Sequence, residues 1–227
     1  GDEANDIWAY TFHSCCSRIL RRFGERIGYT NHFTIYDTDD SRRVMKQCQK
    51  QLGIEDKLIN HKSILAEISR AKDSLVSPKE YKQTAQNDFR KSKIAECYEL
   101  YQSQLKKSDA MDFDDIIFNT VKLLEENEDV RDLYQTQFKY VMVDEYQDTN
   151  HAQYVLTSLL ADKYKNICVV GDDDQSIYRF RGATIENILS FENHYKGAKV
   201  IRLEENYRST QNILDGANAV ISHNKNR

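Results

Sequence analysis

The chain has very little proline and glycine. Of its 227 residues, one is proline, Pro78, and eight are glycine. So few turn-forming residues exclude a many-stranded β-sandwich or a low-complexity linker. The five cysteines are scattered without a Cys-x-x-Cys pair, which argues against a disulfide scaffold or a zinc ribbon and suits a reducing cytoplasm. Without an 18-residue apolar run or a signal-like leader, the sequence predicts a cytoplasmic protein with no membrane span.

A further absence concerns nucleotide binding. No stretch has the spacing Gly-x-x-x-x-Gly-Lys-Ser/Thr, and no Gly-Lys dipeptide occurs. The chain therefore lacks the usual loop that cradles the β- and γ-phosphates of ATP. The net charge of −4 alone gives no indication of nucleic-acid binding. Residues 1–110 carry a net charge of +3 and the remainder −7, which is compatible with one part meeting phosphate and another holding a cation.

The first 137 residues are predicted to be mainly helical. We expect a strand at 7–12, an arginine-rich helix to about residue 27, and a short strand at 33–36. Apolar spacing then predicts helices at 37–51, 63–75, 77–107, 111–127 and 129–137. The helix at 77–107 begins with Ser77 as N-cap, Pro78 at its first position and Glu80 completing a capping box.

After residue 139, short apolar runs alternate with helical patterns. YVMVDE, NICVVGD and KVIRLEEN predict strands, and helices are expected at about 151–163, 184–194 and 209–223. The last helix is expected to bury its apolar residues, which are Ile213, Leu214, Ala217, Val220 and Ile221. This alternation predicts a parallel sheet covered on both faces, whose ligands lie beyond the carboxyl ends of the strands.

Carboxylates collect at these predicted strand ends. Of the adjacent Asp144 and Glu145, one can hold Mg²⁺ while the other takes a proton from water, although a solvated strand end is the plainer interpretation. Gly171 permits a sharp turn before Asp172–Asp174, whose repulsion requires a cation, arginines or backbone donors to offset it. Gln175 offers an amide that can sense a phosphate without adding charge.

Aromatic residues interleaved with arginines follow. Tyr178, Phe180 and Arg181 lie in a Tyr-Arg-Phe-Arg run that suits stacked bases and a phosphate backbone, although an amphipathic core strand shows the same pattern. Tyr207 and Arg208, at a predicted strand-to-helix junction, could stack a base and reach a phosphate.

Two further patterns have plainer interpretations. After TFHS (11–14), arginines at 18, 21, 22 and 26 lie roughly along one helical face, where a solvated charged face is the simpler explanation. In MDFDD, the carboxylates of Asp112, Asp114 and Asp115 most simply cap the following helix, so we leave them out of the predicted site.

Together the motifs resemble those of one family. VDEYQDTN, VVGDDDQSIYRFRGA and LEENYRST, in this order and spacing, resemble three successive motifs of the UvrD/PcrA/Rep-type superfamily 1 DNA helicases, and TFHS with RILRRFG resembles an earlier one. The resemblance runs from Ile7 to about Asn224. It implies an α/β fold, a parallel-sheet RecA-like domain of the P-loop NTPase type with an all-helical inserted subdomain. Residues 1–36 would begin the RecA-like domain, 37–137 would form the insertion, and 138–227 would form the domain's carboxyl-terminal part.

The resemblance also implies roles at a nucleotide site. Asp144 would ligate Mg²⁺, and Glu145 would polarise the water that attacks the γ-phosphate of ATP. Gln175 and Arg208 would contact the γ-phosphate, and Tyr207 would stack on the adenine.

A second set of roles concerns DNA. Tyr178 and Phe180 would lie against bases of single-stranded DNA, and Arg181 would help to fix their loop. Thr11, Phe12 and His13 would lie along the DNA path. Many relatives have Trp where this chain has Phe180, and the smaller ring should stack more weakly.

We therefore expect part of an ATP-dependent DNA helicase or translocase, which couples Mg-ATP hydrolysis to 3′–5′ movement on single-stranded DNA and to duplex unwinding in repair or replication. The chain starts after the place of the family's P-loop and stops before the second RecA-like domain, so by itself it should be inactive. Two alternatives stay open. One is a Mg²⁺-dependent nuclease built on Asp144, Glu145 and Asp172–Asp174. The other is a non-catalytic module whose helical block binds a duplex or a partner protein.

Overall fold

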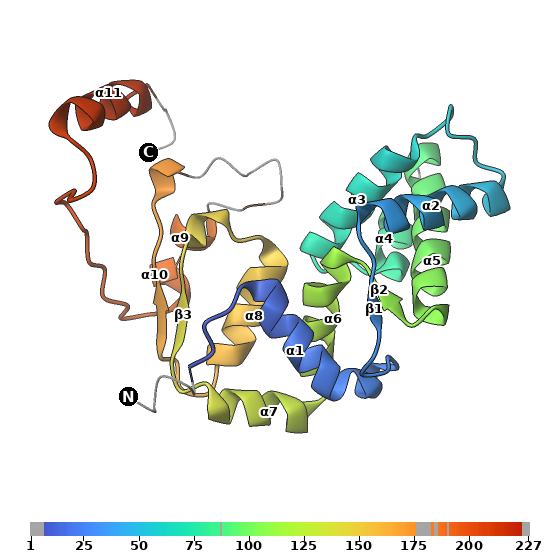
Figure 1. Cartoon of the computed structure of the whole chain (residues 1–227), viewed down its shortest axis with the longest axis horizontal. Coiled ribbons are helices and arrows are strands. Elements are labelled where there is room, and N and C mark those ends of the chain that lie inside the picture. The colour runs from blue at the N-terminus through green and yellow to red at the C-terminus, as the bar shows by residue number, and fades with distance from the viewer. Residues whose placement is uncertain (1–6, 87, 176–182, 184–185, 190, 224–227) are drawn as a thin grey trace. The chain divides into compact units, whose positions relative to one another are not determined.

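The computed structural model describes residues 7–86, 88–175, 183, 186–189 and 191–223 (Figure 1). The chain forms two compact units. The first unit comprises residues 1–141 and 150–168, and the second comprises residues 142–149 and 169–227. Among the helices described, none has the length and apolar character needed to cross a membrane.

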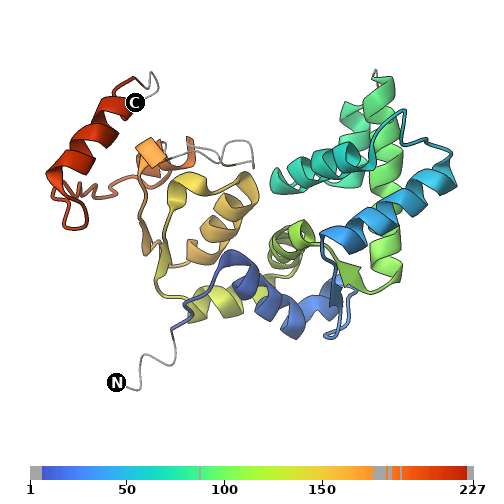
Figure 2. The same ribbon diagram turned by 45° about the horizontal axis from the view of Figure 1, so that its top comes forward.

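One core of the first unit is built around helix α6 (Phe113–Glu126). It packs against α1 (Phe12–Phe23), α7 (Glu128–Gln137) and α8 (His151–Ala161), and Figures 1 and 2 show α1, α6 and α8 side by side. A short 3₁₀ segment, η2 (Gly24–Ile27), continues α1. Apolar stripes on these helices meet in the interior, where they bury Cys16, Ile19, Leu20, Ile116, Val121, Leu124 and Leu156.

A second core in the same unit lies among four helices. These are α2 (Thr38–Leu52), α3 (His61–Asp73), α4 (Pro78–Thr84) and α5 (Phe89–Lys107), grouped together in Figure 2. Their apolar faces bury Met45, Ile64, Ile68, Ile94, Tyr98, Tyr101 and Leu105. Strand β1 (Thr34–Ile35) before this group pairs in parallel with β2 (Ala110–Met111) after it, so the four helices leave and return at one small sheet.

The predicted helices of the first unit are confirmed to within a few residues at 37–51, 63–75, 111–127, 129–137 and 151–163. The helix predicted at 77–107 is wrong in one respect, because it is broken into α4 and α5. The predicted capping box of Ser77 and Glu80, with Pro78 at the first position, is present. A second N-cap, Asp88, accepts the N–H of Lys91 (3.0 Å) and starts α5.

The strand predicted at 7–12 is also wrong. Residues 7–11 have no regular secondary structure, and α1 begins at Phe12. Trp8 instead packs edge-on against the rings of Tyr134 and Phe138, at centroid distances of 6.0 and 5.1 Å. Aromatic contacts with α7 and with Phe138 directly after it, rather than a neighbouring strand, therefore hold this segment.

A second sheet contains β3 (Val141–Val143) and β4 (Ile167–Val169). The N–H of Val141 donates to the carbonyl of Asn166 (2.9 Å), and the N–H of Val170 donates to that of Val143 (2.8 Å), so the two strands run in the same direction. In the second unit, the 3₁₀ turns η3 (Tyr146–Asp148) and η4 (Asp173–Gln175) follow these strands. Helices α9 (Glu186–Leu189), α10 (Phe191–His194) and α11 (Gln211–Ile221) complete it.

Two predictions for the second unit are wrong. KVIRLEEN forms no strand, so the described part of this sheet has two strands rather than three, and Leu203 is 88% exposed. Helix α11 forms where expected, but none of its residues is buried. Its apolar stripe lacks an opposing surface in the described residues, and Ile213 and Val220 stay exposed.

Candidate nucleotide site and nucleic-acid interface

The carboxyl ends of β3 and β4 bring two polar segments together. Asp144 and Glu145 follow β3, and Asp172 follows β4 two residues after Val170. Because the strands are parallel neighbours, these ends lie at one edge of the sheet. The N–H of Tyr146 donates to the carbonyl of Val170 (2.9 Å) and joins the two turns. Two of the three predicted strand ends therefore carry their polar residues at one edge of the described sheet.

A chain of hydrogen bonds connects Glu145 to Gln175. The Glu145 Oε2 accepts from Gln147 Nε2 (2.7 Å), and Gln147 Oε1 accepts from the N–H of Asp172 (3.0 Å). The Asp172 Oδ2 in turn accepts from Gln175 Nε2 (2.7 Å). Gln147 is buried, whereas Glu145, Asp172 and Gln175 are exposed, so a fixed amide links side chains that a ligand can reach.

Two backbone features hold this chain in place. A Cβ at Gly171 would lie 2.6 Å from Gln147 Oε1 and 2.8 Å from Ile188 Cδ1, so any other residue here would displace the ends of these two side chains. Glu145 has φ = +51°, in the left-handed region that is costly for a residue with a Cβ. Strained backbone of this kind clusters at active sites and ligand clamps.

The donor set suits a magnesium ion that is held mainly by phosphate and water. Mg²⁺ usually takes one or two protein carboxylates and keeps several waters. Asp144 is exposed, and its Oδ1 accepts the N–H of Glu145 (2.9 Å), which leaves Oδ2 for such a contact. Nearby, burial and then the charge of Glu145 raise the pKa of Asp148. Within the described ranges, no group of three or more His, Cys, Asp or Glu side chains could hold a metal ion.

The other predicted nucleotide residues are not joined to this chain of bonds. Tyr207 is 92% exposed and Arg208 is exposed too. They lie in a turn in which Asn206 Oδ1 accepts the N–H groups of Arg208 and Ser209 (2.9 Å each). The predicted DNA residues Tyr178, Phe180 and Arg181 lie outside the described residues.

The TFHS motif opens α1. Thr11 is its N-cap, with Oγ1 accepting the N–H of Ser14 (3.3 Å), and Phe12 packs against the core around α6. The ring of His13 stacks on Phe113, with centroids 3.6 Å apart and planes 19° apart. Burial lowers the pKa of His13, against an opposing backbone hydrogen bond with Phe113. Phe113 is 59% exposed, so the pair offers an aromatic surface to solvent.

The arginines of α1 and η2 do more than form a solvated face. Arg21 donates to the carbonyls of Asn31 and Phe33, and its guanidinium lies 3.7 Å from the centroid of the Phe33 ring. Arg26 pairs with Asp129 at 2.8 Å. The Arg21 contacts hold the segment between η2 and β1, and the exposed Arg26–Asp129 pair joins η2 to the start of α7.

Two residues of these sites were not predicted from the sequence. Gln147 lies in a run of polar residues with no distinguishing spacing, and its role as a bridge depends on the closeness of Gly171. Phe113 lies off the buried stripe of α6, directly after a capping Asp. An aromatic residue expected at an exposed helix position is the sequence feature that could have pointed to Phe113.

Parallel strands with helices along the chain place this protein in the α/β class. The family model of the UvrD/REP helicase N-terminal domain matches residues 1–196. Over all 227 residues, the chain is 51% identical to an ATP-dependent DNA helicase PcrA of Staphylococcus epidermidis and 49% identical to one of Bacillus subtilis. It is 50% identical over 226 residues to one of Leuconostoc citreum. The chain spans about 30% of the length of these relatives. It belongs to the UvrD/REP helicase N-terminal domain family, as its motifs predicted.

Proposed function

We propose that this chain is part of an ATP-dependent DNA helicase or translocase. It would contribute to Mg-ATP hydrolysis that drives 3′–5′ movement on single-stranded DNA and duplex unwinding. The observation that carries the proposal is the chain of hydrogen bonds from Glu145 to Gln175 at the ends of two parallel strands. The names of the relatives support the same activity. Residues 37–137 would be a helical insertion in the RecA-like domain.

Glu145 is suited to act as the general base. Its carboxylate is exposed, and the hydrogen bond from Gln147 directs one oxygen while the other stays available to water. A base must lie within hydrogen-bond reach of the proton that it takes. Asp144, the adjacent exposed carboxylate, would hold Mg²⁺, which supplies neutralisation of phosphate charge when bound.

Gln175 would connect the nucleotide to DNA. Its amide donates to Asp172, and a γ-phosphate oxygen would compete for the same N–H. The residues that directly follow Gln175 include Tyr178, Phe180 and Arg181, which are the predicted contacts to bases and their loop. A movement of Gln175 on phosphate binding would therefore be passed along only a few residues of backbone to the proposed DNA contacts.

A second DNA-facing surface would be the stacked pair His13 and Phe113, next to Thr11 and Phe12. A base can stack on any exposed aromatic face, so such a surface binds single strands with little sequence preference. Arg208 and Tyr207 would complete the nucleotide contacts from their exposed turn.

The test is a hybrid in which these 227 residues replace the matching segment of the Bacillus subtilis relative. We expect the hybrid to hydrolyse ATP when single-stranded DNA is present. Glu145→Gln should slow hydrolysis by about 10²–10⁴-fold, because the amide cannot accept the water's proton, while Mg-ATP binding is retained. Glu192→Gln, an exposed carboxylate on α10, is the matched control and should change little. A folded hybrid with no DNA-stimulated hydrolysis, or an unchanged rate in Glu145→Gln, would contradict the proposal.

The chain by itself should show no ATPase activity above background. The motivation is the missing Gly-x-x-x-x-Gly-Lys-Ser/Thr loop, whose amides and lysine hold the phosphates for attack. Steady turnover by the purified chain that Asp144→Asn abolishes would show that another group holds the phosphates.

A further inference from the structure

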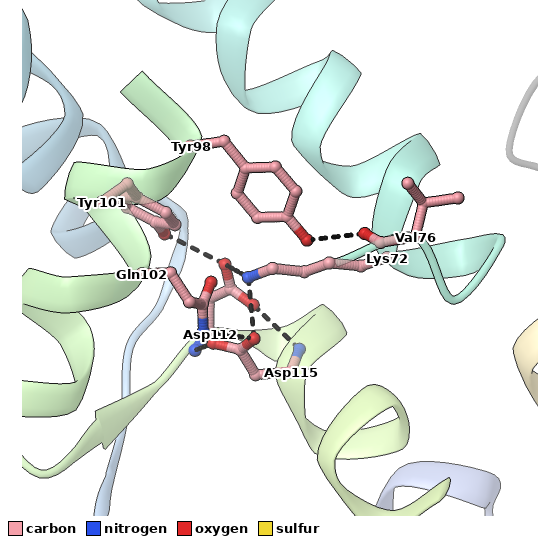
Figure 3. A network of polar contacts seen from close by, with 7 residues as sticks. All are labelled: Lys72, Val76, Tyr98, Tyr101, Gln102, Asp112 and Asp115. Atoms are coloured by element: carbon pink, nitrogen blue, oxygen red, sulfur yellow. Dashed lines mark hydrogen bonds and ion pairs between the residues drawn. The ribbon is translucent and has the colours of Figure 1, made fainter. Parts of the chain in front are cut away.

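A charged network lies inside the first unit, between helices α3, α5 and α6. Lys72 is 1% exposed, and its Nζ lies 2.7 Å from Asp112 Oδ2 and 2.8 Å from Asp115 Oδ1 (Figure 3). The hydroxyl of Tyr101 also donates to Asp112 Oδ2 (3.0 Å), and Gln102 Nε2 donates to Asp115 Oδ1 (2.9 Å). Three helices therefore meet at two carboxylates.

The charges in this network depend on one another. Burial disfavours a charged lysine, yet Asp112 and Asp115 hold the pKa of Lys72 well above its usual value. Burial, reinforced by the charge of Asp112, raises the pKa of Asp115 to about 6. Replacing a buried ion pair by apolar residues is often neutral or stabilising, so stability alone does not account for three charged groups at one point. In this chain the directional bonds of the network fix how α3, α5 and the start of α6 lie relative to one another.

The same two carboxylates begin helix α6. Asp112 Oδ1 accepts the N–H of Asp115 (2.9 Å), and Asp115 Oδ2 accepts the N–H of Asp112 (3.1 Å). Each carboxylate thus uses one oxygen for the helix cap and the other for Lys72. Phe113 lies between them as the first residue of α6, so the network holds its backbone. Its ring points out of the network and stacks on His13.

We infer that the buried network of Lys72, Asp112 and Asp115 is a positioning device that holds the Phe113 ring against His13. Ion pairs and cap hydrogen bonds link Lys72 to Asp112 and Asp115, and the backbone of Phe113 between these two residues carries the ring that stacks on His13. A ring held in its binding direction loses less entropy when a base stacks on it. The value of this positioning for DNA rests on the proposed function, whereas the positioning itself does not.

The positioning is tested by NMR of the 227-residue chain. The ring protons of His13, assigned with His13→Gln, should be shifted upfield by the Phe113 ring, and Phe113→Ala should remove that shift. Lys72→Met should lose most of it, and Tyr101→Phe, which deletes one hydroxyl, should lose a smaller part. Ile68→Ala is the matched control, because Ile68 is buried on the same helix but takes no part in the polar network.

Three results would overturn the inference. One is a parental His13 shift in folded Lys72→Met and Tyr101→Phe chains. Another is an equal loss of the shift in Ile68→Ala, which would mean that any damage to α3 disturbs the pair. If Lys72→Met fails to fold, Tyr101→Phe decides, and an unchanged shift there counts against the inference.

A separate measurement tests the consequence for DNA. In the hybrid protein, anisotropy with a labelled single-stranded oligonucleotide should show about tenfold weaker binding for Phe113→Ala. Lys72→Met should weaken DNA binding by a smaller factor than Phe113→Ala does. The double variant Lys72→Met/Phe113→Ala should bind no more weakly than Phe113→Ala alone. Parental affinity in Phe113→Ala, combined with the predicted NMR shifts, would reject this DNA surface and leave the positioning intact.

Discussion

The two units treat similar apolar residues in opposite ways. In the first unit, Ile19, Leu20 and Tyr101 are completely enclosed, and even the charged Lys72 is buried. In the second unit, the side chains of Leu203 and Val220 are mostly exposed, although they too belong to apolar patterns. The difference shows that an apolar stripe defines a face, whereas an opposing surface decides whether that face is buried.

The polar networks of the two units also differ in how far they are buried. Around Lys72 the partners are buried and hold helices in place. Around Gln147 the bridging amide is buried, but Glu145 and Gln175 at its two ends are exposed. The exposed ends leave Glu145 and Gln175 open to solvent, while the bridging amide of Gln147 lies against Gly171.

The largest expected effect sharpens this comparison. Lys72→Met should lower the free energy of unfolding of the first unit by about 3–5 kcal/mol, because it leaves buried carboxylates without their cation. Lys82→Met is the control, since the Lys82 pair with Glu99 is exposed on both sides, and it should cost about 1 kcal/mol or less. Hydrogen exchange of the amides in α3, α5 and α6 measures the loss of unfolding free energy in each of the two variants. Equal losses in the two variants would contradict the distinction.

The next prediction compares two leucines. Leu20→Ala should cost about 2–5 kcal/mol, because it leaves a cavity in the core around α6. Leu203→Ala should stay within about 0.5 kcal/mol, because the side chain is exposed. Urea unfolding followed by hydrogen exchange in each unit separates them. A large loss from Leu203→Ala would show that this segment packs against a surface after all.

A smaller effect is expected at the bridging amide. Gly171→Ala should cost about 1–3 kcal/mol, because the new methyl group would overlap Gln147 Oε1. In the hybrid it should also slow ATP hydrolysis. Gly216→Ala in α11 is the matched control, because a Cβ there meets nothing within 4 Å and alanine favours a helix by up to about 1 kcal/mol. If Gly171→Ala kept parental stability and the parental rate, the close approach at Gly171 would have no consequence.

The smallest effect is a pH dependence at His13. Its folded pKa is lowered by burial, so the unfolded chain takes up the proton first as the pH falls below about 6.5. The contribution of His13 to stability is therefore present above that value and is lost on acidification. Burial raises the pKa of Asp73 to about 7, so protonation of Asp73 favours the folded state as the pH falls. The effect of His13 is therefore measured as the difference between the parent and a variant without His13.

Melting curves of the parent and of His13→Gln between about pH 7.5 and pH 5.5 give that difference. The parent should lose no more than about 2 °C relative to the variant, because the ring is partly solvated. If the melting temperatures of the two proteins changed equally with pH, the lowered pKa of His13 would be contradicted.

Much of the first unit was predictable because its signals are local. The N-cap and capping box at Ser77 and Glu80 are read from four adjacent residues, and both are present. The break before α5 was not predicted, because the apolar spacing runs through it while Asp88 supplies a competing cap. The strand expected at 7–12 failed for a different reason, since Trp8 found aromatic partners far along the chain.

For this protein, the sequence alone determined the capping box at Ser77 and Glu80, the order of the motifs and the family, because each depends on neighbouring residues. It also placed Asp144, Glu145 and Gln175 at strand ends. Only the tertiary structure decided that Gln147 and Asp172 connect them, and that Phe113 stacks on His13. The physical reason is that a hydrogen bond or a ring contact depends on distances of a few ångströms between distant segments, which residue spacing does not encode.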